Sequence, residues 1–150
     1  MREQAHMALA LAEAEAAAAR GEVPVGAVLV ETASGTVLAR AGNRVEELND
    51  PTAHAEMLAI REAAAQRGEP RLTDCDLYVT LEPCAMCAQA VSLARLRRLI
   101  FGAYDAKGGG VEHGARVFDH PTCHHAPEVI GGVMESDAAA LLKTFFAARR

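Results

Sequence analysis

The sequence predicts an α/β fold in which helices cover both faces of a mixed β-sheet of about five strands. Two apolar runs, at residues 23–30 and 37–41, flank the turn signal Ser34-Gly35 and predict a β-hairpin. Further along the chain, helical segments alternate with short apolar runs, which is typical of parallel strands joined by helices. The chain has 150 residues, so we expect a single domain over residues 1–150.

Composition and charge exclude several classes of protein. The 51% content of hydrophobic residues argues against disorder, and no apolar run approaches the ~20 residues that a membrane helix needs. The net charge of −5 argues against a general nucleic-acid binder but leaves room for a basic patch at one site. Two of the four cysteines have metal-ligand spacing. Cys75 and Cys123 are therefore expected to be free thiols, which indicates a reducing cytoplasm.

The first expected element is a helix over residues 2–20. Its apolar stripe consists of Met7, Leu11, Ala14 and Ala18, which have helical spacing. Gly21 is placed just past the end of this helix. The run at 23–30 is almost continuously apolar, which predicts a strand buried on both faces.

A second helix is expected after the hairpin. Residues 46–51 read as a polar loop, and Thr52 is a suitable N-cap for a helix that runs to Arg67. Further along, a strand is expected at 76–81, a helix at 84–94 and a strand at 99–103. A loop at 105–110, a short helical piece at 111–118 and a short strand at 129–130 are expected next, and a final amphipathic helix at 135–150.

The pattern H-x-E…P-C-x-x-C spans two of these helix starts. Pro83 suits the first turn of a helix, and the positive end of that helix favours the thiolate form of Cys84 and Cys87. His54 supplies a third ligand, so zinc would keep an open position for water. A C-x-x-C pair alone could be a redox pair or half of a structural zinc site. The complete pattern is the signature of zinc nucleobase deaminases.

Two nearby residues have both a functional and a structural interpretation. Glu56 is expected to carry protons to and from the reacting water and substrate, although glutamate in a first turn is also favoured by the helix dipole. Spacing alone favours a turn role for Asn43, although its amide could also hydrogen-bond a base edge. The run 120–125 holds His and Cys without a clear ligand spacing, so no second metal site is expected there.

Seven segments of the sequence resemble one family: the bacterial tRNA-specific adenosine deaminases, within the cytidine-deaminase-like superfamily. The resemblance covers nearly the whole chain, and the wording DPTAHAE and LEPCAMC is closer to this subfamily than to other deaminases. The segments lie at 22–28, 42–44, 50–56, 77–87, 101–103, 105–107 and 145–146.

This resemblance implies a three-layer α/β/α fold of the cytidine-deaminase type. It also implies a homodimer that converts the wobble adenosine of a tRNA anticodon loop to inosine by hydrolytic deamination. One zinc ion per subunit would be bound by His54, Cys84 and Cys87, and Glu56 would move protons.

The resemblance further implies substrate contacts. Asn43 would contact the flipped adenine, which reverses the preference drawn from spacing alone, and Asp105 would meet the neighbouring ribose. The loop at His120-Pro121 and the helix with Phe145 and Phe146 would line the anticodon-loop groove. Tyr104 stands where some members carry arginine, so we expect a modest, salt-dependent affinity for tRNA.

Two other functions remain open at this point. A free-base or nucleoside deaminase acting on guanine, cytosine or cytidine would use the same zinc chemistry, and the acidic net charge slightly favours it. A structural zinc module that only binds partners would instead need a fourth protein ligand and would give Glu56 no role.

Overall fold

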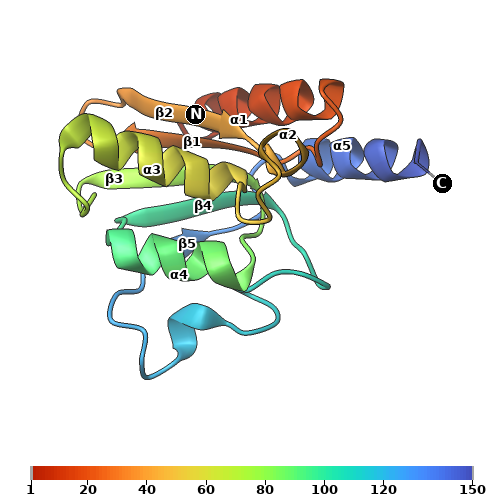
Figure 1. The fold of residues 1–150 in the computed structure, drawn as a ribbon. Coiled ribbons are helices and arrows are strands. Elements are labelled where there is room, and N and C mark those ends of the chain that lie inside the picture. The colour runs from red at the N-terminus through yellow and green to blue at the C-terminus, as the bar shows by residue number, and fades with distance from the viewer. Residues whose placement is uncertain (1, 150) are drawn as a thin grey trace.

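The computed structural model describes residues 2–149 and shows a mixed five-stranded sheet in the order β2-β1-β3-β4-β5 (Figure 1). β1 is antiparallel to β2 and β3, whereas β3, β4 and β5 are parallel. This confirms the predicted hairpin and the parallel strands that follow it. The strands are β1 Gly26–Glu31, β2 Val37–Gly42, β3 Cys75–Leu81, β4 Arg98–Ala103 and β5 Glu128–Ile130.

Helices cover both faces of this sheet, as predicted. α3 and α4 pack on one face, and α1 and α5 pack on the other (Figure 1). The helices are α1 Arg2–Ala19, α2 Val45–Leu48, α3 Ala55–Arg67, α4 Ala85–Ala94, the 3-10 turn η1 Val117–Asp119 and α5 Glu135–Ala147. The last helix was expected to reach residue 150, but α5 ends at Ala147, and Arg150 lies outside the described residues.

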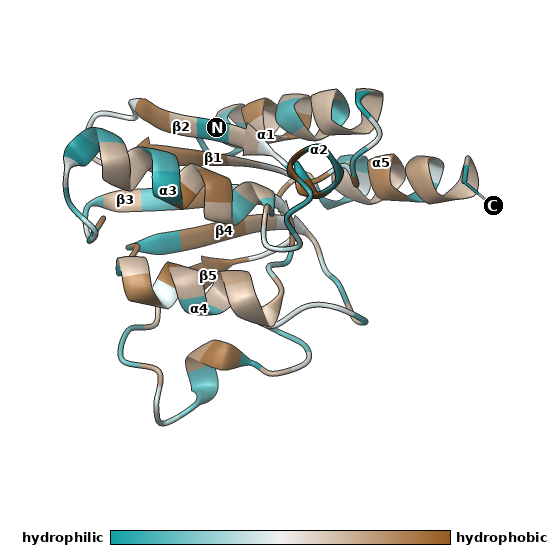
Figure 2. Cartoon of the chain, in the orientation of Figure 1, coloured by the Kyte–Doolittle hydropathy of each residue, from teal (hydrophilic) through white to brown (hydrophobic). Residues whose placement is uncertain are grey.

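The core lies on both faces because side chains of the central strands alternate between them. In β1, Ala27 and Leu29 pack with α3 and α4, while Val28 and Val30 pack with α1. Figure 2 accordingly shows hydrophobic colours along β1. Among residues 2–149, no helix combines the length and the apolar character needed to cross a membrane.

The two helices that carry the metal motif at their starts both begin later than predicted. The N-cap of α3 is His54, not Thr52. Thr52 instead bonds to Asp50 through its N–H and its hydroxyl, at 2.8 and 2.7 Å, and so forms a local turn before the helix. Pro83 precedes the N-cap Cys84 and therefore lies just outside α4, not in its first turn.

One predicted loop also differs from the structure. The expected polar loop at 46–51 overlaps the short helix α2. Both carboxylate oxygens of the buried Glu22 accept hydrogen bonds from the N–H groups of Glu46 and Glu47, at 3.1 and 2.8 Å. This long-range contact satisfies the first turn of α2, and no local sequence pattern indicates it.

Candidate metal centre and active site

Three side chains of the predicted motif meet at one point. His54 Nδ1 lies 3.6 Å from Cys84 Sγ and 3.5 Å from Cys87 Sγ, and all three ligand atoms fall within 4.8 Å of one another. A tetrahedral zinc ion with ordinary Zn–S and Zn–N bonds would place nitrogen and sulfur about 3.6 Å apart. The three residues therefore fit zinc, and the donor set leaves one coordination position open.

Helix starts direct these ligands toward one another. His54 is the N-cap of α3 and Cys84 is the N-cap of α4, both with extended backbone and without a side-chain cap hydrogen bond. An N-cap side chain usually folds back onto its own helix, whereas here it is directed to the metal site. Cys87 lies in the first turn of α4 and is fully buried.

The electrostatics of the site favour a metal ligand and a proton carrier side by side. A hydrogen bond from the Cys87 thiol lowers the pKa of Cys84 to about 4, so this sulfur is a thiolate at neutral pH. Burial raises the pKa of Glu56 to about 7, because this residue is 4% exposed and its carboxylate is poorly solvated. A carboxyl group with a pKa near neutrality can both accept and release a proton.

A pocket of about 490 Å³ opens in front of these groups. This volume lies in the range of small-molecule sites. Residues from five short stretches of the chain meet in it, and the first and the last, Gly21 and Gly108, are more than eighty positions apart in the sequence. Its polar and metal-binding lining residues are Glu22, Asn43, Glu46, His54, Glu56, Glu82, Cys84 and Asp105.

Asn43 is fixed at the edge of this pocket by three hydrogen bonds. Its N–H donates to Val25 O at 3.1 Å, and its carbonyl accepts from the Arg20 guanidinium at 3.1 Å. Its side-chain Oδ1 accepts from Ala55 N–H at 2.8 Å and so caps α3 in place of His54. The turn role favoured by spacing is therefore wrong, since Asn43 links the end of β2 to the start of a distant helix.

The other predicted substrate contacts are divided between this pocket and other places. Asp105 lines the pocket. His120 is exposed, and its Nε2 lies 2.6 Å from Ala115 O, within its own loop. Phe145 is buried against α1, in a separate groove between α1 and α5. The structure thus brings Asp105 to the site and leaves the side chains of His120 and Phe145 outside it.

A second hollow of about 500 Å³ adjoins the pocket and shares Asp105 and Gly108 with it. Tyr104 and Phe146 line this hollow, and they are 45% and 47% exposed. Exposed aromatic rings beside a deep pocket are suited to stack on unpaired bases. Phe146, not Phe145, is therefore the aromatic residue of α5 that faces the site.

Sequence reasoning assigned no role to two buried carboxylates that line the pocket. Glu22 and Glu82 are both 2% exposed, and both accept backbone N–H hydrogen bonds, Glu22 from the first turn of α2 and Glu82 from a loop. The available signal was the position of Glu82, an acidic residue that directly follows a strongly apolar strand. Such a residue is rarely buried unless it is paired.

Comparisons with known proteins give one consistent family. Residues 1–103 match the family described as "Cytidine and deoxycytidylate deaminase zinc-binding region". A tRNA-specific adenosine deaminase from Agrobacterium fabrum is 58% identical over 100% of this chain and 98% of its own length. The Aquifex aeolicus relative of the same name is 48% identical over 92% of this chain and 89% of its own.

Solved structures agree with this result. One, from a study of A-to-I editing by tRNA:A34 deaminases at the wobble position, has a TM-score of 0.89 and 59% identity, over 92% of this chain and 99% of that chain. A guanine deaminase from Nitrosomonas europaea has a TM-score of 0.81 at 26% identity, over 96% of this chain and 84% of that chain. The predicted cytidine-deaminase-like fold is thereby confirmed.

Proposed function

This chain belongs to the family of tRNA-specific adenosine deaminases, and we propose that it converts the wobble adenosine of a tRNA anticodon loop to inosine. The observation that carries this proposal is the His54–Cys84–Cys87 group with the buried Glu56 beside it, in a chain 58% identical along its full length to such an enzyme. The activity is assigned to residues 1–150 acting as one domain, with one zinc ion per subunit.

His54, Cys84 and Cys87 would hold the zinc. When bound, zinc acts as a Lewis acid that makes an activated water available near neutral pH. The reaction adds this water to the ring carbon that carries the amino group and releases ammonia. Glu56 would accept one proton from the water and deliver it to the ring nitrogen. It would then take the second proton, from the added hydroxyl group, and pass it to the amino group, which leaves as ammonia while the carbonyl forms. Its raised pKa supports this role, since the same carboxylate must take up and release a proton in each cycle.

Asn43 would donate a hydrogen bond to the target base. Because its Oδ1 already accepts the Ala55 N–H, its side-chain NH₂ group is the part of the amide that it would offer to the substrate. It would therefore pair with an acceptor atom of the base, such as a purine ring nitrogen. Replacing Asn43 with aspartate keeps the cap on α3 but removes the donor, so we expect substrate binding to weaken while the fold persists.

The adjoining hollow would take a nucleotide next to the target. Unpaired anticodon bases can be splayed apart, which lets one base enter the metal pocket while a neighbour contacts Tyr104 or Phe146. Asp105 lies between the two hollows, where it would meet the neighbouring ribose. These contacts do not depend on a strongly basic surface, in keeping with the net charge of −5.

The proposal includes a homodimer and a cytoplasmic location. The resemblance of the sequence to this family implies the homodimer. Four cysteines without a disulfide are suited to a reducing compartment. Light scattering of the purified protein tests the dimer, and a monomeric mass at micromolar concentration would contradict it.

The deciding experiment compares substrates with zinc-loaded protein. We expect inosine in an anticodon stem-loop with a wobble adenosine, and no ammonia from free guanine, cytosine or cytidine. A Glu56→Gln variant serves as the matched inactive control. Ammonia from a free base, with the stem-loop unchanged, would instead assign the chain to the free-base deaminases and overturn the tRNA substrate.

A further inference from the structure

The carboxylate of Glu82 holds a loop that forms one wall of the pocket. Its side chain is 0% exposed. Oε2 accepts three consecutive backbone N–H groups, from Val111, Glu112 and His113, at 3.2, 2.9 and 3.1 Å. A carboxylate that accepts several backbone donors fixes the path of the chain that supplies them, because the buried N–H of Val111 and the carboxylate would otherwise lack a partner.

The second oxygen of Glu82 reaches the pocket-lining part of the same loop. Oε1 accepts the N–H of Asp105 at 3.0 Å and lies 2.8 Å from Nδ1 of His113. The side chain of Asp105 is fixed in turn, since its Oδ1 accepts the N–H groups of Lys107 and Gly108 at 3.1 and 2.9 Å. The hydrogen bond from Asp105 to Glu82 therefore places the turn that carries the Asp105 carboxylate.

Glycines allow the loop to approach this carboxylate closely. A Cβ at Gly109 would lie 2.4 Å from Oε2 of Glu82, and a Cβ at Gly110 would lie 2.5 Å from the backbone nitrogen of Ala85. Both distances are too short for any side chain. The loop is thus packed tightly between the Glu82 carboxylate and the first residue of α4.

We propose that Glu82 is a positioning residue that acts on the substrate through Asp105. By holding the Asp105 N–H, it sets the wall between the metal pocket and the adjoining hollow, where the nucleotide next to the target adenosine lies. This inference rests on the proposed function, because it assigns Glu82 to binding of the flanking nucleotide and not to the chemical step.

Glu82→Gln tests this inference selectively. A glutamine keeps one acceptor oxygen and gains an NH₂ group. With its oxygen toward the three N–H groups of residues 111–113, the NH₂ group must face the N–H of Asp105, and the link to Asp105 becomes repulsive. We expect KM for the anticodon stem-loop to rise about tenfold, equivalent to about 1.4 kcal/mol. We expect kcat and bound zinc to stay within about twofold of the wild type.

A control variant separates positioning from loss of stability. Asp76 is a buried carboxylate at the opposite end of the same strand, paired with Arg97 and Arg98. Asp76→Asn should lower the melting temperature and leave KM unchanged. Equal increases in KM for Asp76→Asn and Glu82→Gln would overturn the inference, because the effect would then follow from stability alone.

A double variant tests whether Glu82 acts through Asp105. If it does, adding Asp105→Ala to Glu82→Gln raises KM no further than Asp105→Ala alone. Fully additive effects would overturn the proposed route. Should Glu82→Gln fail to fold, Gly109→Ala disturbs the same link, because its Cβ would lie 2.4 Å from Oε2 of Glu82 and 2.5 Å from the carbonyl oxygen of Asp105. It is expected to raise KM likewise, and an unchanged KM would count against the inference. Failure of the wild type to deaminate the stem-loop would contradict the proposed function itself.

Discussion

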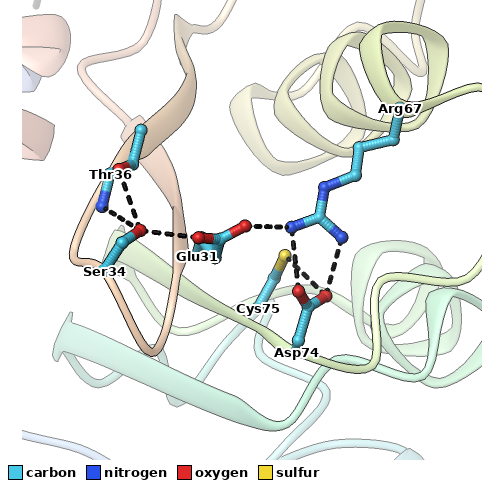
Figure 3. Close-up of polar contacts among 6 residues, drawn as sticks. All are labelled: Glu31, Ser34, Thr36, Arg67, Asp74 and Cys75. Atoms are coloured by element: carbon cyan, nitrogen blue, oxygen red, sulfur yellow. Dashed lines mark hydrogen bonds and ion pairs between the residues drawn. The ribbon is translucent and has the colours of Figure 1, made fainter.

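Strand β3 carries one polar cluster at each end, and the two clusters are built differently. At its start, Arg67 of α3 pairs with Asp74 through two hydrogen bonds of 2.8 and 2.9 Å and with Glu31 through one of 2.9 Å (Figure 3). We call these three residues the Arg67 cluster. At its other end, Glu82 accepts backbone N–H groups from a distant loop.

Solvent accounts for much of the difference between the clusters. The side chains of Arg67, Glu31 and Asp74 are 24%, 36% and 52% exposed, so water screens their attraction. Glu82 is fully buried, and its partners are backbone groups that need an acceptor. The Arg67 cluster therefore adds modest stability between the end of α3 and the sheet, whereas Glu82 determines the conformation of a loop. We expect changes at the site end to alter function and changes at the Arg67 end to alter stability.

The largest expected effect is that of Cys84→Ala, which removes a zinc ligand at the site end. We expect loss of bound zinc and of all measurable deamination, because two protein ligands hold the ion weakly. The matched control is Cys75→Ala at the other end of β3. There, burial raises the thiol pKa to about 12, so Cys75 is no thiolate. Zinc content and deamination rate should both be lost in Cys84→Ala and unchanged in Cys75→Ala. Retained zinc in Cys84→Ala would contradict the assigned ligand set.

Glu56→Gln should have the next largest effect. The amide cannot accept or release the proton that the reaction moves, so we expect kcat to fall by about 10²–10⁴-fold. Zinc content and stem-loop binding should persist, because Glu56 is not among the ligands. Full activity in this variant would end the proposed mechanism.

Arg67→Ala tests the other side of the comparison. We expect the free energy of unfolding to fall by about 1 kcal/mol, because paired but partly exposed charges are lost. Activity should not change. Urea unfolding with and without 1 M salt tests this, because the Debye length falls to about 3 Å at 1 M salt and the charges are screened. The difference in unfolding free energy between the wild type and the variant should be smaller at high salt. Arg71→Ala, at a more exposed ion pair of 3.9 Å, is the control with almost no expected effect.

The smallest expected effect is a dependence on pH. The hydrogen bonds from Arg67 hold the pKa of Asp74 below its usual value of 3.8. Asp74 therefore stabilises the folded state above that value, and this contribution is lost as pH falls through the lowered pKa of the folded state. Stability measured from pH 6 to pH 2 should decline slightly less steeply in Arg67→Ala than in the wild type. An identical slope would show that Asp74 does not depend on Arg67.

Local patterns predicted the elements correctly where burial and periodicity agree. The helix at 2–20, the strand at 76–81 and the helix at 84–94 match α1, β3 and α4 within one residue at each end. Helix starts were harder to place, because competing contacts came from outside the segment. Thr52 was a suitable cap by residue type, yet Asn43, twelve residues before Ala55, supplies the hydrogen bond to α3.

The sequence alone predicted the fold class and the His54–Cys84–Cys87 group that the structure brings together, with Glu56 as the proposed proton carrier. The spacing of His54, Glu56, Cys84 and Cys87 at helix starts matches the signature of zinc nucleobase deaminases, and few other kinds of site share it. Tertiary structure decided the shape of the pocket. Glu22 and Glu82 act on backbone groups 23 to 31 residues away, and Phe146 rather than Phe145 faces the site. Such contacts depend on which segments the sheet brings together, and a side chain's identity does not encode its distant partner.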